Sequence, residues 1–269
     1  MPTEELIPMD RWFADHNGSY ESPERSIGLL SKTFPSLSFY FQYVCNVWFS
    51  AGEAKRGVYD GKRWAETSHK VLLSLESVGI KISISGAKHL EGLDGGCVFV
   101  GNHMSMCETM ILPAIIRPLM EVTFVVKESL IDYPIFKHIL RSRNPIAVTR
   151  NNPREDFKTV MQEGKKRLTD GIAVVVFPQT TRANGFDPEQ FNSIGVKLAS
   201  KAGVPVVPLA LKTDAWGNGR WLKDFGKVSP EKTIHFEFGE PMAISGRGDE
   251  QQAATIDFIQ SRMTQWERS

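Results

Sequence analysis

From residue 80 onward the chain alternates short apolar runs with amphipathic segments, and this alternation restricts the possible folds more than any other feature. Most of the apolar runs are rich in β-branched residues and apolar on both faces, as strands covered by helices must be. We therefore predict an α/β fold with a mixed, largely parallel central sheet of about seven strands flanked by helices. The predicted strands are residues 80–84, 97–101, 123–127, 145–149, 172–177, 204–211 and 233–238.

The clearest predicted helix runs from Pro153 to Leu168. Asn152 can cap it, proline suits its first position, Glu155 and Asp156 face its positive end, and basic residues close its last turn. Its expected buried stripe consists of Phe157, Val160, Met161 and Leu168. Further helices are predicted at residues 193–202, ending at Gly203, and at the C-terminus, with Ile256, Ile259, Met263 and Trp266 on one side.

The N-terminal part lacks this alternation, so we divide the chain into an N-terminal helical segment, residues 1–79, and an α/β domain, residues 80–269. Within the first part, residues 33–52 carry no charge and seven aromatic side chains, and basic residues such as Lys32 and Lys55 flank them. A proline and several polar residues make this stretch a poor bilayer-spanning helix. Its composition suits the interface between water and lipid, but it equally suits a helix buried against the α/β core, and both interpretations stay open.

Bulk composition excludes some functional classes. Lys and Arg total 32 against 31 for Asp and Glu, so the net charge of +1 gives no reason to expect nucleic acid as a partner. The three cysteines are odd in number and lack metal-ligand spacing, which fits a reducing compartment. The first residues include acids and prolines where a secretory signal needs a basic start and an apolar core, so we expect a cytoplasmic protein.

The apolar run 97–101 leads directly into Asn102 and His103, and Glu108 follows five positions later. Open α/β sheets bind ligands at the carboxyl ends of their strands, and an imidazole whose tautomer is fixed by a carboxylate is a competent base near neutral pH. The same glutamate also completes an S-x-x-E capping box that begins at Ser105. The two roles are compatible, because a side chain at the third position of a helix points back toward the preceding loop.

Two arginines also follow predicted strands. "NPIAVTRNNP" places Arg150 after one strand, and "VVVFPQTTRANG" places Arg182 after another. Arginine binds phosphate through a planar fork of donors, although each arginine alone also fits a surface or capping residue. No metal site is predicted, since the chain has no His-Glu-x-x-His sequence, no cysteine pair and no acidic cluster.

From about Ile80 to Met242 the chain resembles the glycerophospholipid acyltransferase family, which includes the lysophosphatidate acyltransferases. "GNHMSMCE" resembles the family's Asn-His-x4-Asp/Glu block, "PIAVTR" its second block, "FPQTTR" its Phe-Pro-Glu-Gly-Thr-Arg block and "AGVPVVPLAL" its fourth block, all in the family's order. "FVVKESLIDYPIF" resembles the lysine-containing run that precedes the second block.

This resemblance implies a mechanism. His103 would remove a proton from a glycerol hydroxyl, which attacks the carbonyl of an acyl thioester, while Glu108 orients and stabilises the histidine. Arg150 and Arg182 would hold the phosphate of the acceptor. The other implied substrate-binding residues are Asn102, Lys127, Phe177, Pro178, Gln179, Thr180 and Thr181. Neither a covalent enzyme intermediate nor a Gly-x-Ser-x-Gly elbow is expected.

The implied reaction belongs to phospholipid biosynthesis. The acyl donor would be acyl-CoA or acyl carrier protein, the acceptor a lysophospholipid such as 1-acylglycerol 3-phosphate, and no cofactor is expected. The protein would lie peripherally on the cytoplasmic face of a membrane. Gln179 and Thr180 replace the family's usual Glu-Gly, and Glu108 replaces the commoner aspartate. Two alternatives therefore stay open: an acyltransferase for a different lipid alcohol, such as a glycolipid or an ornithine-type lipid, and a non-catalytic protein that binds lipid phosphate.

Overall fold

The computed structural model describes residues 16–93, 96–133, 136–179 and 181–268. Over these residues an eight-stranded sheet has the order β1-β2-β8-β7-β3-β6-β4-β5. Strands β1 and β2 pair antiparallel, as do β7 and β8, and the other five neighbouring pairs are parallel. The strands are β1 (Tyr20–Glu21), β2 (Lys81–Ser85), β3 (Val98–Gly101), β4 (Val122–Lys127), β5 (Ile146–Val148), β6 (Ala173–Val176), β7 (Val206–Lys212) and β8 (Thr233–Phe238).

This sheet confirms the predicted fold class. All seven predicted strands are present, with ends within two residues of the predicted ones. The unpredicted strand, β1, has two residues and pairs Tyr20 with Ile84 at one edge of the sheet. A segment of two residues is too short to show the alternation of apolar and polar side chains from which strands are predicted.

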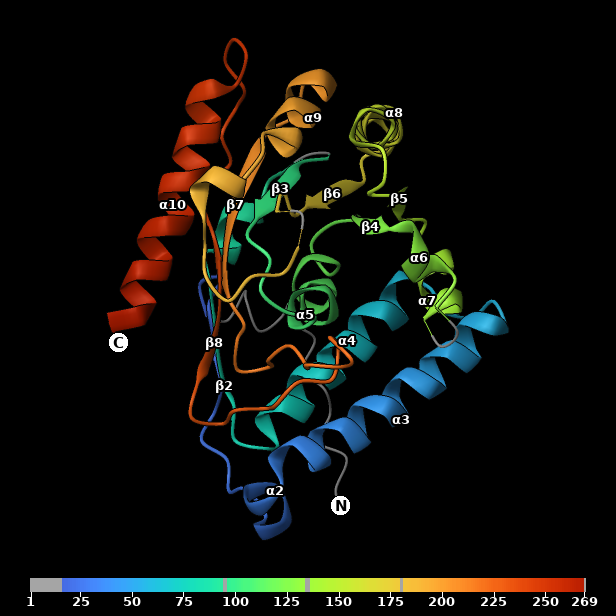
Figure 1. Cartoon of the computed structure of the whole chain (residues 1–269), viewed down its shortest axis with the longest axis vertical. Coiled ribbons are helices and arrows are strands. Elements are labelled where there is room, and N and C mark those ends of the chain that lie inside the picture. Colours follow the sequence, from blue (N-terminus) through green and yellow to red (C-terminus); the bar gives the residue numbers. More distant parts are fainter. Residues whose placement is uncertain (1–15, 94–95, 134–135, 180, 269) are drawn as a thin grey trace.

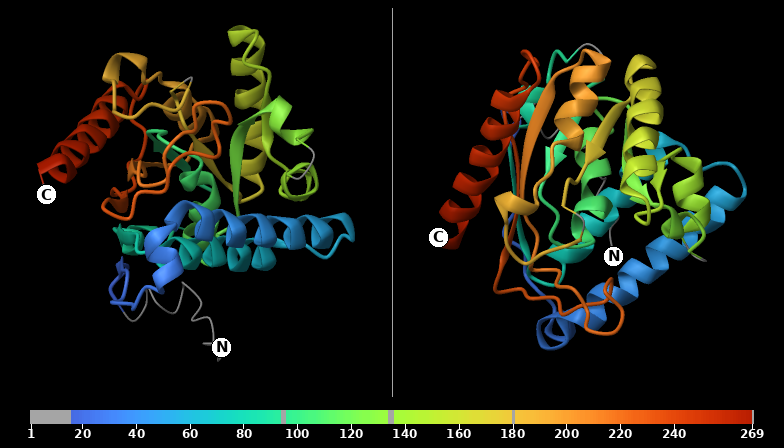
Figure 2. Two further views of the ribbon diagram at one scale, coloured as in Figure 1. Left: turned by 60° about the horizontal axis from the view of Figure 1, so that its bottom comes forward. Right: turned by 45° about the horizontal axis from the view of Figure 1, so that its top comes forward.

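Helices cover both faces of the sheet (Figure 1). Strand β3 shows how its side chains divide between them: Phe99 packs in the hydrophobic cluster with α3, α4 and α5, and Val98 and Val100 pack in the cluster with α8, α9 and α10. Figure 2 shows α3 and α4 lying together, with α8 and α10 beyond the sheet. The helices are α2 (Leu29–Thr33), α3 (Pro35–Lys55), α4 (Gly61–Glu76), α5 (Cys107–Ile116), α6 (Glu128–Ile131), α7 (Lys137–Ser142), α8 (Pro153–Thr169), α9 (Ile194–Ala202) and α10 (Asp249–Arg268), with 3-10 turns η1 (Ala87–Leu90) and η2 (Pro188–Gln190).

The ends of helix α8 agree with the prediction, but one side chain expected in the core is not buried. Asn152 caps it by accepting a hydrogen bond from the backbone N–H of Glu155 at 3.3 Å. Val160, Met161 and Leu168 are buried, but Phe157 is 41% exposed, so the predicted buried stripe was wrong at its first member. Phe157 instead lines a cavity, with Lys197 Nζ 5.9 Å from the centre of its ring.

Helix α3 contains most of the uncharged aromatic stretch and is apolar on two sides. Phe39 and Tyr43 are buried in the core, whereas Leu37, Phe41 and Trp48 on the opposite side are each about 70% exposed. The buried side agrees with the interpretation of this stretch as a core helix. The second apolar side of α3 is exposed and is covered by none of the described residues. None of the helices in the described ranges has the length and hydropathy that crossing a bilayer requires. The division of the chain at residue 80 stays a prediction.

Candidate active site

Four strand ends bring the predicted site residues to one edge of the sheet. Because β3, β6, β4 and β5 are parallel neighbours, their carboxyl ends lie side by side. His103 follows β3, Lys127 ends β4, Arg150 follows β5, and the segment containing Arg182 follows β6. These four side chains line the same cavity, so residues far apart in the sequence converge as the strand ends predict.

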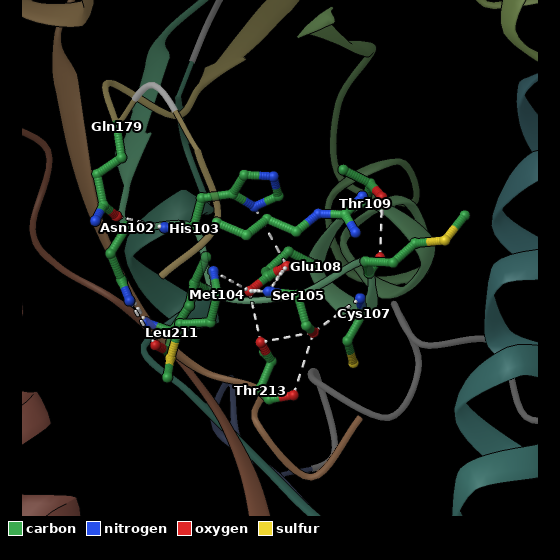
Figure 3. Close-up of polar contacts among 12 residues, drawn as sticks. Asn102, His103, Met104, Ser105, Cys107, Glu108, Thr109, Gln179, Leu211 and Thr213 are labelled. Carbon is green, nitrogen blue, oxygen red and sulfur yellow. Dashed lines mark hydrogen bonds and ion pairs between the residues drawn. The ribbon is translucent and has the colours of Figure 1, made fainter. Parts of the chain in front are cut away.

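His103 is held by the segment that follows β6 (Figure 3). Its imidazole stacks on the ring of Phe177, with 4.6 Å between ring centroids and 7° between planes. Its backbone N–H donates to the side-chain oxygen of Gln179 at 2.8 Å, and its carbonyl accepts from the N–H of Ala183 at 3.0 Å. The side chain is 11% exposed, and it lines the cavity. Three separate contacts therefore fix the position of this imidazole.

Glu108 lies beneath the imidazole and is fully buried. Its Oε2 is 3.4 Å from His103 Nδ1, slightly longer than an ordinary hydrogen bond. Its Oε1 accepts from the backbone N–H of Met104 and of Ser105, both at 2.9 Å, and from the hydroxyl of Thr213 at 2.5 Å. The predicted capping box forms only in part: Glu108 reaches back to the N–H of Ser105, but α5 begins at Cys107 with Met106 as its N-cap, and Ser105 Oγ accepts from the N–H of Cys107 at 3.1 Å instead of from that of Glu108. Glu108 thus contacts both the imidazole and the backbone of the loop before α5.

These contacts keep Glu108 ionised. Burial by itself raises the pKa of a carboxyl group, but the neighbouring His103, the Thr213 hydroxyl and the Ser105 N–H favour the charged form more strongly, so the pKa of Glu108 lies below its ordinary value. A buried carboxylate beside Nδ1 favours the tautomer that carries its proton there. The other ring nitrogen, Nε2, is then unprotonated and can accept a proton.

Arg150 has an unusual backbone conformation, with φ of 61°. Asp156 supports this turn, because its carboxylate accepts from the N–H of Thr149 at 2.8 Å and from the N–H of Arg150 at 2.7 Å. Left-handed conformations cost energy in residues other than glycine and are found where function requires them. Burial, and then the positive charge of Arg182, lower the pKa of Arg150. The two guanidinium groups are therefore close enough to interact.

Arg182 makes an ion pair with Asp224, at 2.6 Å between Nη1 and Oδ1, and both residues line the cavity. Asp224 belongs to the connection between β7 and β8, for which no role was predicted from the sequence. The arginine side chain is 20% exposed. One of the two arginines expected to bind phosphate is thus already paired with a carboxylate of the protein.

The remaining predicted residues divide into two groups. Lys127, Phe177, Pro178 and Gln179 line the cavity, as His103, Arg150 and Arg182 do. Asn102 is fully buried and does not line the cavity. Its side-chain amide donates to the carbonyl of Leu211 at 2.7 Å and accepts from the backbone N–H of Leu211 at 2.9 Å. Thr181 is exposed and is not part of the cavity lining, and Thr180 lies outside the described residues.

The cavity measures about 560 Å³, which is in the usual range for small-molecule sites. Residues of α3, α4, β4 and α7 line it, and many of its side chains are apolar, among them Trp64, Phe124, Val126 and Phe136. The histidine and the arginines described above line the same cavity. Such a lining suits a hydrocarbon chain with a charged head group. In the described ranges no cluster of three or more His, Cys, Asp or Glu side chains is arranged to hold a metal ion.

Sequence reasoning missed three residues of this site: Thr213, Asp156 and Asp224. Thr213 directly follows β7, which is parallel to β3, so its place after a strand was a usable signal. Asp156 was expected to act only on the positive end of α8. Asp224 comes from a long connection whose path no local pattern predicts.

Comparison with known proteins agrees with this architecture. Residues 81–212 match the family model described as Acyltransferase. A 1-acyl-sn-glycerol-3-phosphate acyltransferase from Pseudomonas aeruginosa is 30% identical over 171 residues, covering 63% of this chain and 62% of that protein. A protein of the same description from Chlamydomonas reinhardtii is 30% identical over 131 residues, covering 49% of this chain and 38% of that protein. The match thus spans less than two thirds of the length of either relative.

A solved structure has the same fold. The crystal structure of the 1-acyl-sn-glycerophosphate acyltransferase PlsC from Thermotoga maritima superposes with a TM-score of 0.68 and 18% identity, covering 89% of this chain and 98% of that chain. The α/β sheet carries a His–Glu pair and two arginines at one edge, and residues 81–212, which include His103, Glu108, Arg150 and Arg182, are those similar to the Acyltransferase family model.

Proposed function

We propose that this protein is an O-acyltransferase that moves a fatty acyl group from a thioester to the free hydroxyl of 1-acylglycerol 3-phosphate. One observation carries the proposal: His103, supported by Glu108, opens into an apolar cavity that also contains Arg150 and Arg182. A base, two phosphate-binding groups and space for hydrocarbon are the components that this reaction needs. The names of the similar proteins from Pseudomonas and Chlamydomonas support the same acceptor.

In the proposed mechanism His103 acts as a general base. Its Nε2 takes the proton of the acceptor hydroxyl as the oxygen attacks the thioester carbonyl, forming a C–O bond. Collapse of the tetrahedral intermediate breaks the C–S bond, and the imidazolium returns the proton to the departing sulfur. Glu108 stabilises the transient imidazolium, and a base positioned in this way contributes roughly 10² to 10⁴ in rate.

Arg150 and Arg182 are the proposed phosphate-binding groups. Arg182 is 20% exposed, so an anion bound there would gain more than at a fully exposed site, and Arg150, which is more exposed, lines the same cavity. Burial, and then repulsion by Arg182, lower the pKa of Arg150, and the phosphate would neutralise that repulsion. Fixing the phosphate also fixes the distance from the glycerol hydroxyl to His103, which supplies the orientation that a reaction between two bound substrates needs.

The acyl donor is proposed to be acyl-CoA or acyl carrier protein, with no cofactor. We further propose that the protein acts peripherally on the cytoplasmic face of a membrane. The outer side of α3, with Phe41 and Trp48 about 70% exposed, supports this placement because such aromatic side chains favour the interface of a bilayer. A lipid acceptor is itself embedded there.

The proposal is tested by following thiol release from acyl-CoA and from acyl carrier protein with two acceptors. We expect release with 1-acylglycerol 3-phosphate from at least one donor, and at least about tenfold slower release with the matched monoacylglycerol, which lacks the phosphate. Equal rates with the two acceptors would contradict the role of the arginines and favour a different lipid alcohol. Binding of lysophosphatidate without thiol release from either donor would instead identify a non-catalytic lipid-phosphate binding protein.

A further inference from the structure

The connection between β7 and β8 contains an ordered loop, residues 217–226, with the most exposed large apolar side chain of the described residues at its tip. Trp221 is 90% exposed and Leu222 is 62% exposed. The loop is closed at its base, where the N–H of Gly217 donates to the carbonyl of Lys227 at 3.0 Å. A Cβ at Gly219 would lie 2.2 Å from the carbonyl oxygen of Leu222, so the tight shape of the tip depends on this glycine. The exposed tip is therefore a built feature of the fold.

This loop packs directly against α3. The hydroxyl of Tyr40 donates to the carbonyl of Gly226 at 2.7 Å, and the rings of Tyr40 and Phe225 lie 5.1 Å apart. Leu37 and Val44 lie three residues before and four residues after Tyr40, so they are its neighbours on the helix surface. Both are exposed, at 68% and 43%. The apolar surface of the loop is thus continuous with the exposed side of α3; Figure 1 shows this segment, in orange, reaching from the sheet toward α3 and α4.

The charges beside the tip favour an anionic surface. Arg220 and Lys223 flank Trp221 and Leu222, and both are exposed. The acid within the loop, Asp224, is turned inward and paired with Arg182 at 2.6 Å. An exposed tryptophan and leucine with basic neighbours match the interface of a bilayer that contains anionic lipids.

The same loop also forms part of the active site. Asn218 donates from its side chain to the carbonyl of Met104 at 2.7 Å, next to His103. Asp224 lines the cavity and contacts Arg182. Contact between the loop tip and a bilayer would therefore place the polar part of the cavity beside the lipid head groups. A lysophospholipid could then reach the base without first crossing water.

We propose that residues 217–226 are a second membrane-binding element, which inserts Trp221 and Leu222 into the interface of an anionic bilayer beside α3 and places the cavity at the lipid surface. The purpose of this element, delivery of a lipid acceptor, rests on the proposed function. Its binding to a bilayer can be measured without measuring catalysis.

The test uses the full-length protein and vesicles of phosphatidylcholine with phosphatidylglycerol. We expect the double variant Trp221→Ser, Leu222→Ser to bind these vesicles about tenfold more weakly, and the matched control Trp221→Phe, Leu222→Met to bind nearly as wild type does. Activity on acceptor embedded in vesicles should fall with binding in the double variant. Activity on a short-chain acceptor below its micelle concentration should stay unchanged, which also shows that the variant folds. Equal vesicle binding by wild type and the double variant would overturn the proposal.

A second measurement does not depend on a destabilising substitution. Lipids brominated near the glycerol end of their chains should quench part of the tryptophan emission of the wild type, and this part should decrease in Trp221→Phe. Identical quenching of the two proteins would also overturn the membrane-binding role. Absence of thiol release from the wild type with every acceptor would instead refute the proposed function and leave both binding measurements valid.

Discussion

The side-chain oxygen of Gln179 accepts a hydrogen bond from the backbone N–H of His103, at 2.8 Å. The residue that departs from the family's usual glutamate thus acts on the backbone of the proposed base. We predict that Gln179→Leu lowers kcat at least about tenfold with little change in KM, because a buried N–H loses its acceptor and the position of the imidazole is less fixed. Steady-state kinetics with both substrates varied would check this, and an unchanged kcat would contradict it.

The variant Gln179→Glu is the matched control for this prediction. A glutamate oxygen can accept the same hydrogen bond from the N–H of His103, so kcat should stay much closer to that of the wild type than in Gln179→Leu. An equal loss of kcat in the two variants would show that this hydrogen bond is not the cause.

The hydrogen bonds from the turn at Arg150 to Asp156 lead us to predict a specific effect of replacing Asp156. Its carboxylate holds the N–H groups of Thr149 and Arg150, and the latter residue has φ of 61°. We expect Asp156→Ala to raise KM for the lysophosphatidate acceptor by about tenfold and to change kcat less, because the guanidinium group is no longer held in place. Glu155→Ala, at the neighbouring position of the same helix turn, is the matched control. Equal KM values for the two variants would contradict the role of Asp156.

Asp224 pairs with Arg182 at 2.6 Å, so its carboxylate would compete with the acceptor phosphate for the same guanidinium group. Removing its charge should therefore lower KM for the acceptor several-fold, an effect of roughly 1 kcal/mol. Asp224→Asn keeps the shape of the side chain for this comparison, and Asp214→Asn, which removes the partner of Lys232 outside the cavity, is the control. A raised KM in Asp224→Asn would show that the carboxylate positions the arginine for substrate.

The buried His69 and the half-buried His235 lead us to predict how stability depends on pH. Burial, and secondarily the charge of Arg25, lower the pKa of His69 to about 4, and burial with the charge of Lys212 does the same for His235. In the unfolded chain such groups bind protons near pH 6.5. Because the unfolded state then binds more protons, the free energy of unfolding should fall as the pH decreases below 6.5, by up to about 1.4 kcal/mol per pH unit for His69 and by less for the more exposed His235.

This pH dependence is measured by urea unfolding at several pH values between 7 and 5. His69→Gln should flatten the decline of the free energy of unfolding, because glutamine cannot titrate. A decline equally steep in wild type and variant would show that His69 is not a source of it. His16, which is exposed, supplies the control variant His16→Gln.

The sequence predicted the sheet and the edge at which the site lies for a simple physical reason. A strand such as residues 173–176 is buried on both faces, and its run of β-branched residues is visible in the sequence. The carboxyl ends of parallel strands lie together, so His103, Arg150 and Arg182 were expected to converge, and they line one cavity. Local patterns were sufficient for these features because each depends on a few consecutive residues.

What local patterns missed depends on contacts between distant segments. The hydroxyl of Thr213 meets Glu108 across 105 positions of sequence, and Asp224 meets Arg182 across 42. Asn102 was expected to contact substrate, but its amide is used on Leu211 of β7, a partner that only the strand order reveals. Phe157 was expected in the core because helical periodicity does not distinguish a side chain that packs in the core from one that lines a cavity.

The most direct test of the central claim is the rate of thiol release by His103→Ala with saturating acyl donor and lysophosphatidate, compared with His138→Ala, which replaces a histidine outside the cavity. If His103 removes the proton from the acceptor hydroxyl, its variant should lose roughly 10² to 10⁴ in kcat while keeping its fold, and the control should retain the wild-type rate. Wild-type turnover by a folded His103→Ala protein would contradict the mechanism.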